Sequence, residues 1–562
     1  MKMKRLKTYL FALLPLAFIT FSCDEEDILV QEQLDNNPLP GAETGDGGVL
    51  DLSNYISLGN SITAGFMDNA LYTNGQNHSF PNLLATQFAI QGVGGGSFNQ
   101  PDINSANGYS SAGPDNNPGT SDDLGRFELS LAQQRPVPTQ GEFFGPYGGD
   151  KSELNNFGVP GMKITDATNP GFANPYYLRF ASNPGTSTVL GDALSTSPTF
   201  FSYWLGNNDI LGYAVAGGVD ESSITSQPNF QSALEQSLGA LVQSGAEGVV
   251  MTLPPFVLLP YFRAVKWNAI TLDQATADQL NAGLGSVNQV LEGMVEANLI
   301  TQADYDEREI SYSAGANPIL AHDTELEDLG PKFDLLLLLN RISAAQREQL
   351  RPYEQSRPLR NGELPLLTAG SLLGTEADGD NSANTPTTTI GAVIPLGYNL
   401  LNPSNSDGDG LFLNIEEFET VVEMTATYNA TIAGVVAGIN AQANGSITLV
   451  DVQPAFADAF GLSPALANAL FDPSNGANPA LAAFADAAEA RADGTLGIMI
   501  EGHNLQPDFA PNGIFSTDGI HPNPRGHAII ANLIIEALNN QKGADIPMVN
   551  VTALRGILAR DF

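Results

Sequence analysis

The stretch Phe200–Leu205, which reads FFSYWL, is a largely apolar run of strand length that leads into the polar block Gly206-Asn207-Asn208-Asp209. A second run of strand length, Val249–Leu253, ends at Pro254. Between the two runs, apolar residues recur with the spacing of a helix at Phe230, Leu234, Leu238, Leu241 and Val242. A strand, a helix and a strand in this order predict a βαβ unit, in which both strands lie parallel in one sheet. The sequence therefore predicts an α/β fold.

The rest of the chain supplies more elements of the same kinds. Tyr55–Leu58 predicts a short strand that enters Gly59, and Phe80–Phe88 has the spacing of a helix. We expect four further elements: a helix over Leu272–Leu299, a long helix from Ile415, a strand over Ile447–Val452, and a last helix that Asn523 caps and Pro524 begins. The polar stretches 100–125 and 355–410 predict long loops, whereas the apolar run Leu335–Leu339 is expected in a buried core.

The N-terminal segment predicts export. Lys2, Lys4, Arg5 and Lys7 precede an apolar run, Tyr9–Phe21, that is too short to span a bilayer, and Ser22-Cys23 follows. We expect a lipoprotein signal peptide over 1–22 and a lipid anchor on Cys23, so that an outer-membrane lipoprotein is tied to the membrane without crossing it. The acidic run Asp24–Asp27 favours display at the cell surface. The alternatives are an ordinary secretory signal with an incidental cysteine and an acidic run that is only a solvated tether.

The remaining length sets the domain plan. Residues 23–50 are polar and Gly-rich and predict a flexible tether, and 546–562 is expected to be a C-terminal extension. Two domains are one interpretation of 51–545. One domain with a long, largely helical insertion at about 256–412 fits better, because the polar blocks described below are spread along the whole of it.

Composition excludes some partners. The chain carries 62 Asp and Glu against 23 Lys and Arg, a formal net charge of −39. Such a surface repels nucleic acid and anionic membrane, so neither is expected as a ligand. Cys23 is the single cysteine, so no disulfide can support the fold. No pattern in the sequence indicates an oligomeric state.

His521 is the histidine best placed to act as a base. Among the five histidines it alone has a carboxylate three residues earlier in a turn-rich segment, Asp518-Gly519-Ile520-His521-Pro522. A bend there would bring the Asp518 carboxylate to Nδ1 and leave Nε2 to take a proton from a serine. His527 lies on the following helix, where a packed helix histidine is the better interpretation.

Ser61 is the candidate nucleophile, at the exit of the first strand. It lacks the Gly-x-Ser-x-Gly elbow, because position 63 is Thr, and taken alone it could equally cap a strand-to-helix turn. Attack by a serine on a carbonyl creates an oxyanion, which needs fixed hydrogen-bond donors. Asn208 would offer a side-chain amide, the block Asn156–Gly161 a backbone N–H, and Ser61 its own N–H.

Together these four blocks resemble those of the SGNH hydrolases, also called GDSL esterases and lipases. Gly59-Asn60-Ser61-Ile62 is similar to the first block, with Asn60 in place of the usual Asp, and Asn156–Gly161 is similar to the second, in which the last glycine, Gly161 here, supplies an oxyanion N–H. The block that contains Asn208 matches the third, and Asp518–Pro522 matches the fourth. The resemblance covers little of the chain and leaves 256–412 unexplained. It implies a three-layer α/β/α sandwich of the flavodoxin-like kind around a parallel sheet, with the ligand at the C-terminal ends of the strands.

We therefore expect a serine ester hydrolase in which Ser61 is the nucleophile, His521 the base and Asp518 its orienting carboxylate, with Ser61, Gly161 and Asn208 around the oxyanion. The substrate would be a small-molecule, lipid or glycan ester, and the mechanism requires no cofactor. The alternatives are an O-acyltransferase of the same fold and a catalytically inactive surface lipoprotein that binds glycan or lipid.

One further motif has the spacing of a calcium-binding EF-hand loop. In Asn405-Ser406-Asp407-Gly408-Asp409-Gly410, followed by Glu416, the oxygen ligands would come from Asn405, Asp407, Asp409 and Glu416. The stretch before it does not predict an incoming helix. A structural calcium ion is one interpretation, and an acidic surface turn with a helix cap is the other.

Overall fold

The computed structural model describes residues 43–130, 132, 135–375, 389–400, 409–443, 445–462, 497–509 and 511–557. The expected signal peptide, Cys23 and most of the expected tether lie outside these residues. So do Asn405 and Asp407 of the calcium motif.

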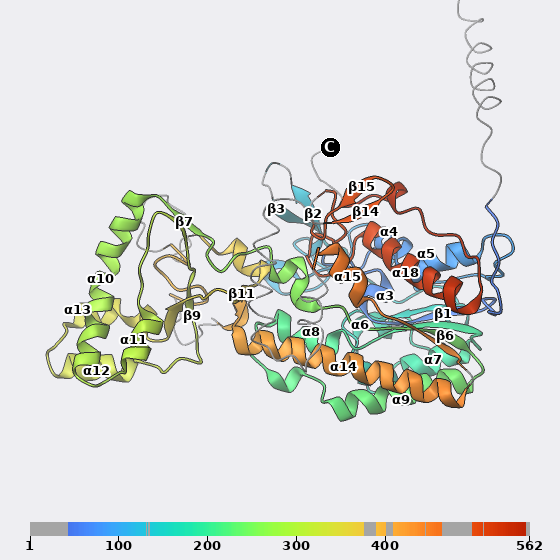
Figure 1. Ribbon diagram of the computed structural model, residues 1–562, viewed down its shortest axis with the longest axis horizontal. Coiled ribbons are helices and arrows are strands. Elements are labelled where there is room, and N and C mark those ends of the chain that lie inside the picture. The colour runs from blue at the N-terminus through green and yellow to red at the C-terminus, as the bar shows by residue number, and fades with distance from the viewer. Residues whose placement is uncertain are drawn as a thin grey trace, which may run out of the picture.

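A five-stranded sheet forms the centre of the larger lobe, on the right of Figure 1. Its strands lie in the order β13-β6-β5-β1-β4, and every pairing between neighbours is parallel. Numbered along the chain, this is the order 2-1-3-4-5 of flavodoxin-like sheets. The bounds are β1 (Tyr55–Gly59), β4 (Asn156–Gly158), β5 (Phe200–Trp204), β6 (Glu247–Met251) and β13 (Ile447–Val450). The prediction of an α/β fold with a parallel sheet is confirmed.

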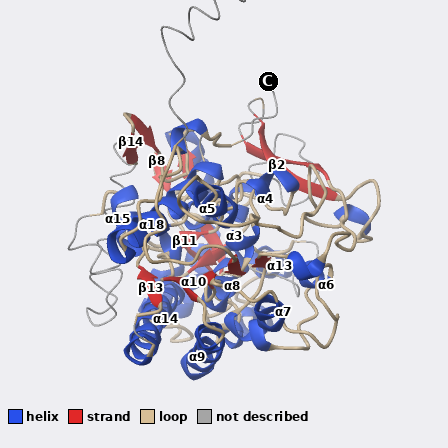
Figure 2. Cartoon of the chain, turned by 90° about the vertical axis from the view of Figure 1, so that its right-hand side faces the viewer, coloured by secondary structure: helices blue, strands red, loops and turns tan. Residues whose placement is uncertain are grey.

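Helices cover both faces of this sheet (Figure 2). On one face α5 (Phe80–Phe88) packs beside α18 (Pro524–Lys542), and on the other α9 (Gln227–Gln243) packs beside α14 (Ile415–Gln442). Asn523 caps α18 through its side-chain oxygen, as the sequence predicts. The shorter helices of this part are α3 (Ser61–Ala64), α4 (Thr73–Asn77), α6 (Pro175–Leu178), α7 (Val189–Ser195), α8 (Asn208–Val215) and α15 (Gln453–Ala459).

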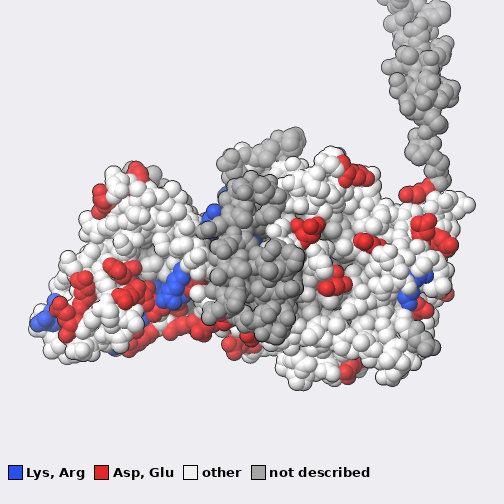
Figure 3. Space-filling model, viewed as in Figure 1, with Lys and Arg blue, Asp and Glu red and all other residues white. Residues whose placement is uncertain are grey.

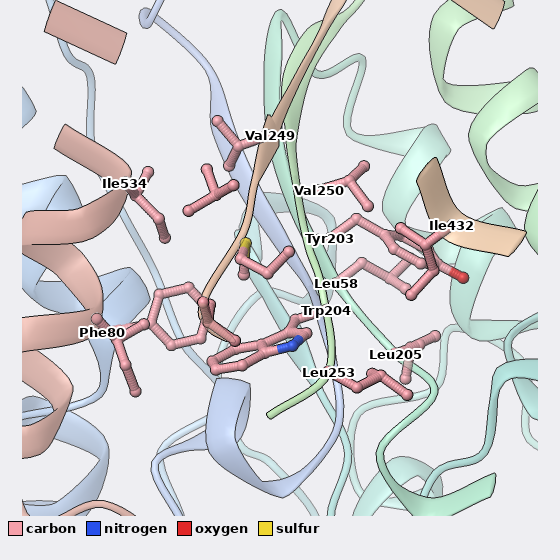
Figure 4. Close-up of a cluster of buried hydrophobic side chains, with 14 of the residues drawn as sticks. Leu58, Phe80, Tyr203, Trp204, Leu205, Val249, Val250, Leu253, Ile432 and Ile534 are labelled. Atoms are coloured by element: carbon pink, nitrogen blue, oxygen red, sulfur yellow. The ribbon is translucent and has the colours of Figure 1, made fainter. Parts of the chain in front are cut away.

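The core lies on both sides of the sheet because successive residues of a buried strand point to opposite faces. In Figure 4, Phe80 of α5, Ile534 of α18 and Val249 of β6 lie on one side, and Tyr203 of β5 and Ile432 of α14 lie on the other. All five side chains are at most 1% exposed. This burial fixes the positions of the strand ends, from which the polar blocks emerge.

The chain leaves the sheet after β6 and builds a second lobe before α14, on the left of Figure 1. This lobe has its own hydrophobic cluster, which includes Leu284, Leu291 and Phe333. Its elements are β7 (Ile270–Leu272), α10 (Gln274–Glu296), α11 (Gln302–Arg308), β8 (Gly315–Asn317), β9 (Leu320–His322), α12 (Gly330–Leu338), α13 (Ala344–Gln349) and β10 (Ser356–Pro358). A small pair, β11 (Leu364–Pro365) and β12 (Phe412–Leu413), leads back to the sheet domain, and Phe256–Phe262 and Leu364 pack in the main core.

The prediction of a buried run at Leu335–Leu339 is wrong. The run lies at the end of α12, where Leu336 faces the core of the lobe and is 8% exposed. Leu338 and Leu339 are 77% and 58% exposed. Helical periodicity explains the difference, because a continuous apolar run in a helix can turn only one side toward a neighbouring core.

The expected domain boundaries at 50 and 545 also need correction. Asp46 and Asp545 exchange two backbone hydrogen bonds, so the last residues of the expected tether pair with the end of the expected domain. Beyond 545, Ile546 and Val551 are buried in the main core. The folded unit thus begins before residue 50 and continues past residue 545, because these flanking segments pack against the sheet domain.

The described part also contains two hairpins. In the first, β2 (Leu124–Ser130) pairs with β3 (Arg135–Gln140), and in the second, β14 (Ile498–Ile500) pairs with β15 (His503–Leu505). Asp and Glu side chains outnumber Lys and Arg on the face shown in Figure 3. No helix among the described residues combines the length and hydropathy that a membrane span needs.

Candidate active site

Ser61 lies directly after β1, at the first position of the short helix α3. Asn60 caps this helix: its Oδ1 accepts the N–H of Ile62 at 3.1 Å, and its side chain is buried. Gly59 makes the turn possible, because a Cβ there would lie 2.1 Å from Oγ1 of Thr63 and 2.8 Å from the carbonyl oxygen of Trp204. The strand end and the capped helix together hold the Ser61 side chain in place, and the residue is 8% exposed.

The second block braces this turn from the neighbouring strand. Asn156 at the start of β4 donates from Nδ2 to the carbonyl oxygen of Thr63 at 2.9 Å. Gly158 lets α3 approach closely, since a Cβ there would lie 2.3 Å from the backbone nitrogen of Ala64. The block therefore fixes the helix that carries Ser61.

Asp518 and His521 lie in the loop before α18, and this loop reaches Ser61. Nε2 of His521 lies 2.9 Å from Oγ of Ser61, and Nδ1 of the same ring lies 2.9 Å from Oδ2 of Asp518. The structure therefore brings the three residues into one hydrogen-bonded row. The His521 side chain is 13% exposed, and its ring also packs against Phe66, with ring centroids 4.9 Å apart.

Four donors surround the Asp518 carboxylate. Oδ1 accepts the backbone N–H groups of Ile520 and His521 at 2.9 Å each, and Oδ2 accepts the N–H of Asn69 at 3.0 Å as well as the His521 ring. Burial alone would raise the pKa of Asp518, but the adjacent His521 ring and these hydrogen bonds outweigh it and lower the pKa to about 2. The carboxylate is consequently ionised at neutral pH and holds the ring by Nδ1.

Gly161 and Asn208 follow β4 and β5, the two strands that pair with β1. Asn208 is the first residue of α8, directly behind β5, and its Nδ2 donates to the carbonyl oxygen of Met162 at 3.0 Å. Gly161 precedes Met162 in a tight turn and has a φ of +80°, which glycine adopts without strain. Because an amide nitrogen carries two hydrogens, the bond to Met162 leaves Asn208 a second donor.

Asp209 ties the Asn208 block to the Gly161 turn. Its Oδ2 accepts the N–H of Ile164 at 2.9 Å, three residues after Gly161. Burial raises the pKa of Asp209 to about 6, against the opposing effects of its hydrogen bonds and of Lys163. This carboxyl group is fully buried, and its hydrogen bond to Ile164 helps to hold the turn that contains Gly161.

Sequence reasoning missed the turn at Asp68 and Asn69. Met67 and Ala70 exchange two backbone hydrogen bonds, and the residues between them have φ angles of 53° and 63°. Oδ1 of Asp68 accepts the N–H of Thr517 at 3.0 Å and the Thr517 hydroxyl at 2.9 Å, and the N–H of Asp68 donates to Oγ of Ser516 at 3.0 Å. With the bond from Asn69 to Asp518, four hydrogen bonds join this turn to the Asp518 loop. The signal for it was the Asp-Asn pair, because these residues tolerate positive φ in tight turns.

A single pocket joins Ser61, His521 and Asn208. It includes about 830 Å³ of space that atoms do not fill, open solvent at its mouth included. The residues that line the pocket come from distant parts of the sequence, because β5, α15 and α18 all contribute to it. The pocket lies where Ser61 follows β1 and Asn208 follows β5, which is the switch point of a sheet with this strand order.

The remaining histidines do not join the site. His527 is buried, its Nδ1 accepts the N–H of Phe80 at 3.1 Å, and burial lowers its pKa to about 3, so it is a packed helix histidine, as expected. His322 lies in the second lobe, where burial likewise lowers its pKa.

Among the described residues no group of three or more His, Cys, Asp or Glu side chains is arranged to hold a metal ion. Of the calcium motif, Glu416 lies in the first turn of α14, and its partners Asn405 and Asp407 fall outside the described residues. Asn414 caps that helix and forms a capping box with Glu417.

Comparisons of the chain with protein-family models, with curated proteins and with solved structures found no match.

Proposed function

We propose that the protein is a serine ester hydrolase of the SGNH type, in which Ser61, His521 and Asp518 form the catalytic triad. The observation that carries the proposal is the row in which Nε2 of His521 lies 2.9 Å from Oγ of Ser61 while Nδ1 lies 2.9 Å from the Asp518 carboxylate. A base within hydrogen-bond reach of a serine hydroxyl, itself held by a carboxylate, is the arrangement that activates serine for attack on a carbonyl.

The reaction proceeds in two halves. His521 takes the proton of Ser61 as Oγ attacks the ester carbonyl, and the ionised Asp518 stabilises the imidazolium that forms. The ring then gives this proton to the leaving alcohol, and the acyl group stays on Ser61. Water enters with His521 as base, the acyl–oxygen bond breaks, and the carboxylic acid leaves.

The oxyanion of each tetrahedral intermediate requires fixed donors. The N–H of Ser61, the N–H of Gly161 and the second hydrogen of the Asn208 amide serve this purpose in the proposal. All three groups come within a few residues of the C-terminal ends of parallel strands that pair with one another, which supports a common position for them.

The test is hydrolysis of p-nitrophenyl esters by the wild type, by Ser61→Ala and by Ser53→Ala, a matched change at an exposed serine. We expect turnover in the wild type and in Ser53→Ala and its loss in Ser61→Ala. An alkyl fluorophosphonate should label the peptide that contains Ser61. Labelling of another serine, or unchanged turnover in Ser61→Ala, would contradict the proposal, and a protein without turnover would favour an inactive binding protein.

We also propose that the enzyme is an exported lipoprotein of the outer membrane, anchored through Cys23. The support is the sequence pattern of residues 1–23. Cys23→Ala should move the protein from the membrane fraction to the soluble fraction, and an unchanged distribution would contradict the anchor.

A further inference from the structure

The lining of the pocket beside Ser61 divides sharply by polarity. Its polar members are confined to the residues that carry or adjoin the proposed chemistry, namely Asn60, Ser61, Asn207, Asn208 and His521. The remaining lining is aliphatic or aromatic, and it continues along α15 and α18. The indole nitrogen of Trp204, which also lines the pocket, already donates to the carbonyl oxygen of Thr252 at 3.0 Å.

The apolar part of the lining consists of closely packed, buried side chains. Phe460 of the α15 end and Phe515 are 2% and 4% exposed, and Ala459 beside them is 3% exposed. On α18 the lining runs from Gly526 through Ile530 to Leu533, a stretch of about 10 Å at 1.5 Å per residue. The pocket is therefore long as well as apolar, and it leads away from the His521 loop, which directly precedes α18.

An unpartnered amide lies at the polar end. The Asn207 side chain is 1% exposed, lines the pocket, and has no hydrogen-bond partner for Nδ2 or Oδ1 among the described residues. A buried amide of this kind usually meets water or a ligand. An ester group placed at Ser61 would bring its oxygens to this end, whereas a sugar in the far part would bury hydroxyl groups without partners, which is unfavourable.

We propose that this pocket binds the alkyl chain of a fatty acyl group, with the ester carbonyl at Ser61 and the chain between α15 and α18. The inference rests on the proposed function for its chemistry. The substrates are then esters of medium-chain or longer fatty acids. Each buried methylene then contributes to transition-state binding, so kcat/KM should rise about fourfold for each one that the pocket holds.

The first experiment compares p-nitrophenyl acetate with p-nitrophenyl octanoate, below the concentration at which the octanoate forms micelles. We expect kcat/KM for the octanoate to be at least about 100-fold higher. Ala459→Trp would fill the pocket and should lower this ratio at least tenfold, whereas Asp458→Trp, at an exposed position of the same helix, should leave the ratio unchanged.

The second experiment does not depend on turnover. The fluorescent fatty acid cis-parinaric acid should bind the Ser61→Ala protein and should bind Ser61→Ala/Ala459→Trp at least tenfold more weakly. Binding without ester turnover in the wild type would support the pocket and overturn the proposed hydrolase. An acetate preferred over the octanoate, or a ratio that Ala459→Trp leaves unchanged, would overturn the pocket and leave the hydrolase standing. Neither turnover nor binding would overturn both.

Discussion

The backbone N–H of Asn69 donates to Oδ2 of Asp518 at 3.0 Å, although 449 residues separate them in the sequence. The same oxygen faces Nδ1 of His521 at 2.9 Å. The position of the carboxylate is thus set jointly by its own loop and by the turn that follows the Ser61 helix. This relationship couples the segment that follows Ser61 to the loop that holds His521 through a backbone N–H.

The Asp68 carboxylate should be a positioning group for this coupling. Asp68→Ala leaves the buried N–H of Thr517 without its acceptor, so the free energy of unfolding should fall by about 1–3 kcal/mol. We also expect kcat to fall, with KM little changed, because the Asp518 loop loses the two hydrogen bonds that Thr517 makes to the Asp68 carboxylate. Asp68→Asn retains an oxygen for Thr517 and places its amide at the Tyr72 hydroxyl, which can accept, so it should restore most of both quantities. Equal losses in the two variants, measured by denaturant unfolding and ester kinetics, would contradict this role.

Asp518→Asn should lower kcat by about 10⁴-fold. An amide in place of the carboxylate turns one oxygen into a donor, and every partner of Asp518 is itself a donor, so the ring loses the partner that fixes its tautomer. Stopped-flow or steady-state ester hydrolysis measures the loss, and Asp458→Asn on the exposed side of α15 is the control. Activity within tenfold of the wild type would show that the carboxylate does not orient His521.

Asn208→Ala should lower kcat by about 10²–10³-fold with KM nearly unchanged, because the amide acts on charge that develops only in the transition state. Asn208→Asp should be slower still, since it removes both donors and adds a negative charge beside the forming oxyanion. Asn512→Ala, at an exposed loop position, is the control. An Asp variant faster than the Ala variant would argue against an oxyanion role.

Asp209→Asn should stabilise the protein in a pH-dependent way. Burial raises the pKa of Asp209 to about 6, above the ordinary value near 3.8, so the native wild type is favoured while the group is protonated and loses stability as pH rises toward and through 6. The neutral Asn escapes this loss. Its advantage should be near zero at pH 4 and reach roughly 3 kcal/mol above pH 7. Urea unfolding at several pH values measures it, and a difference that does not change with pH would show that ionisation of Asp209 is not the cause.

The strands and the polar residues that follow them were predicted well from the sequence, because both depend on local patterns. The apolar runs at Tyr55, Phe200 and Val249 each became parallel strands, and the polar residues behind them emerge at one edge of the sheet. Ser61, His521 and Asp518 meet as their spacing and residue types suggested. Asn60 makes the capping bond to Ile62 that the turn after β1 needs.

What the sequence did not predict depends on contacts between distant segments. The Asp68–Asn69 turn is bonded to Asp518 only once the fold is complete, and nothing local to residue 68 indicates that partner. The pocket is formed by segments that are separated by hundreds of residues, so no single window shows its lining. The prediction that Leu338 is buried was wrong for a related reason. Hydropathy is a property of one residue, whereas burial depends on which other part of the chain packs against it.

Ser61 and His521 are 460 positions apart in the sequence, so the two residues are made at different times. At ordinary rates of translation the ribosome adds His521 roughly 20–90 s after Ser61. Through that interval Ser61 lacks the imidazole that contacts it in the folded protein, so on the proposed mechanism a chain released early would be inactive. The hydrogen-bonded row is complete only after the loop before α18, which holds Asp518 and His521, has been made.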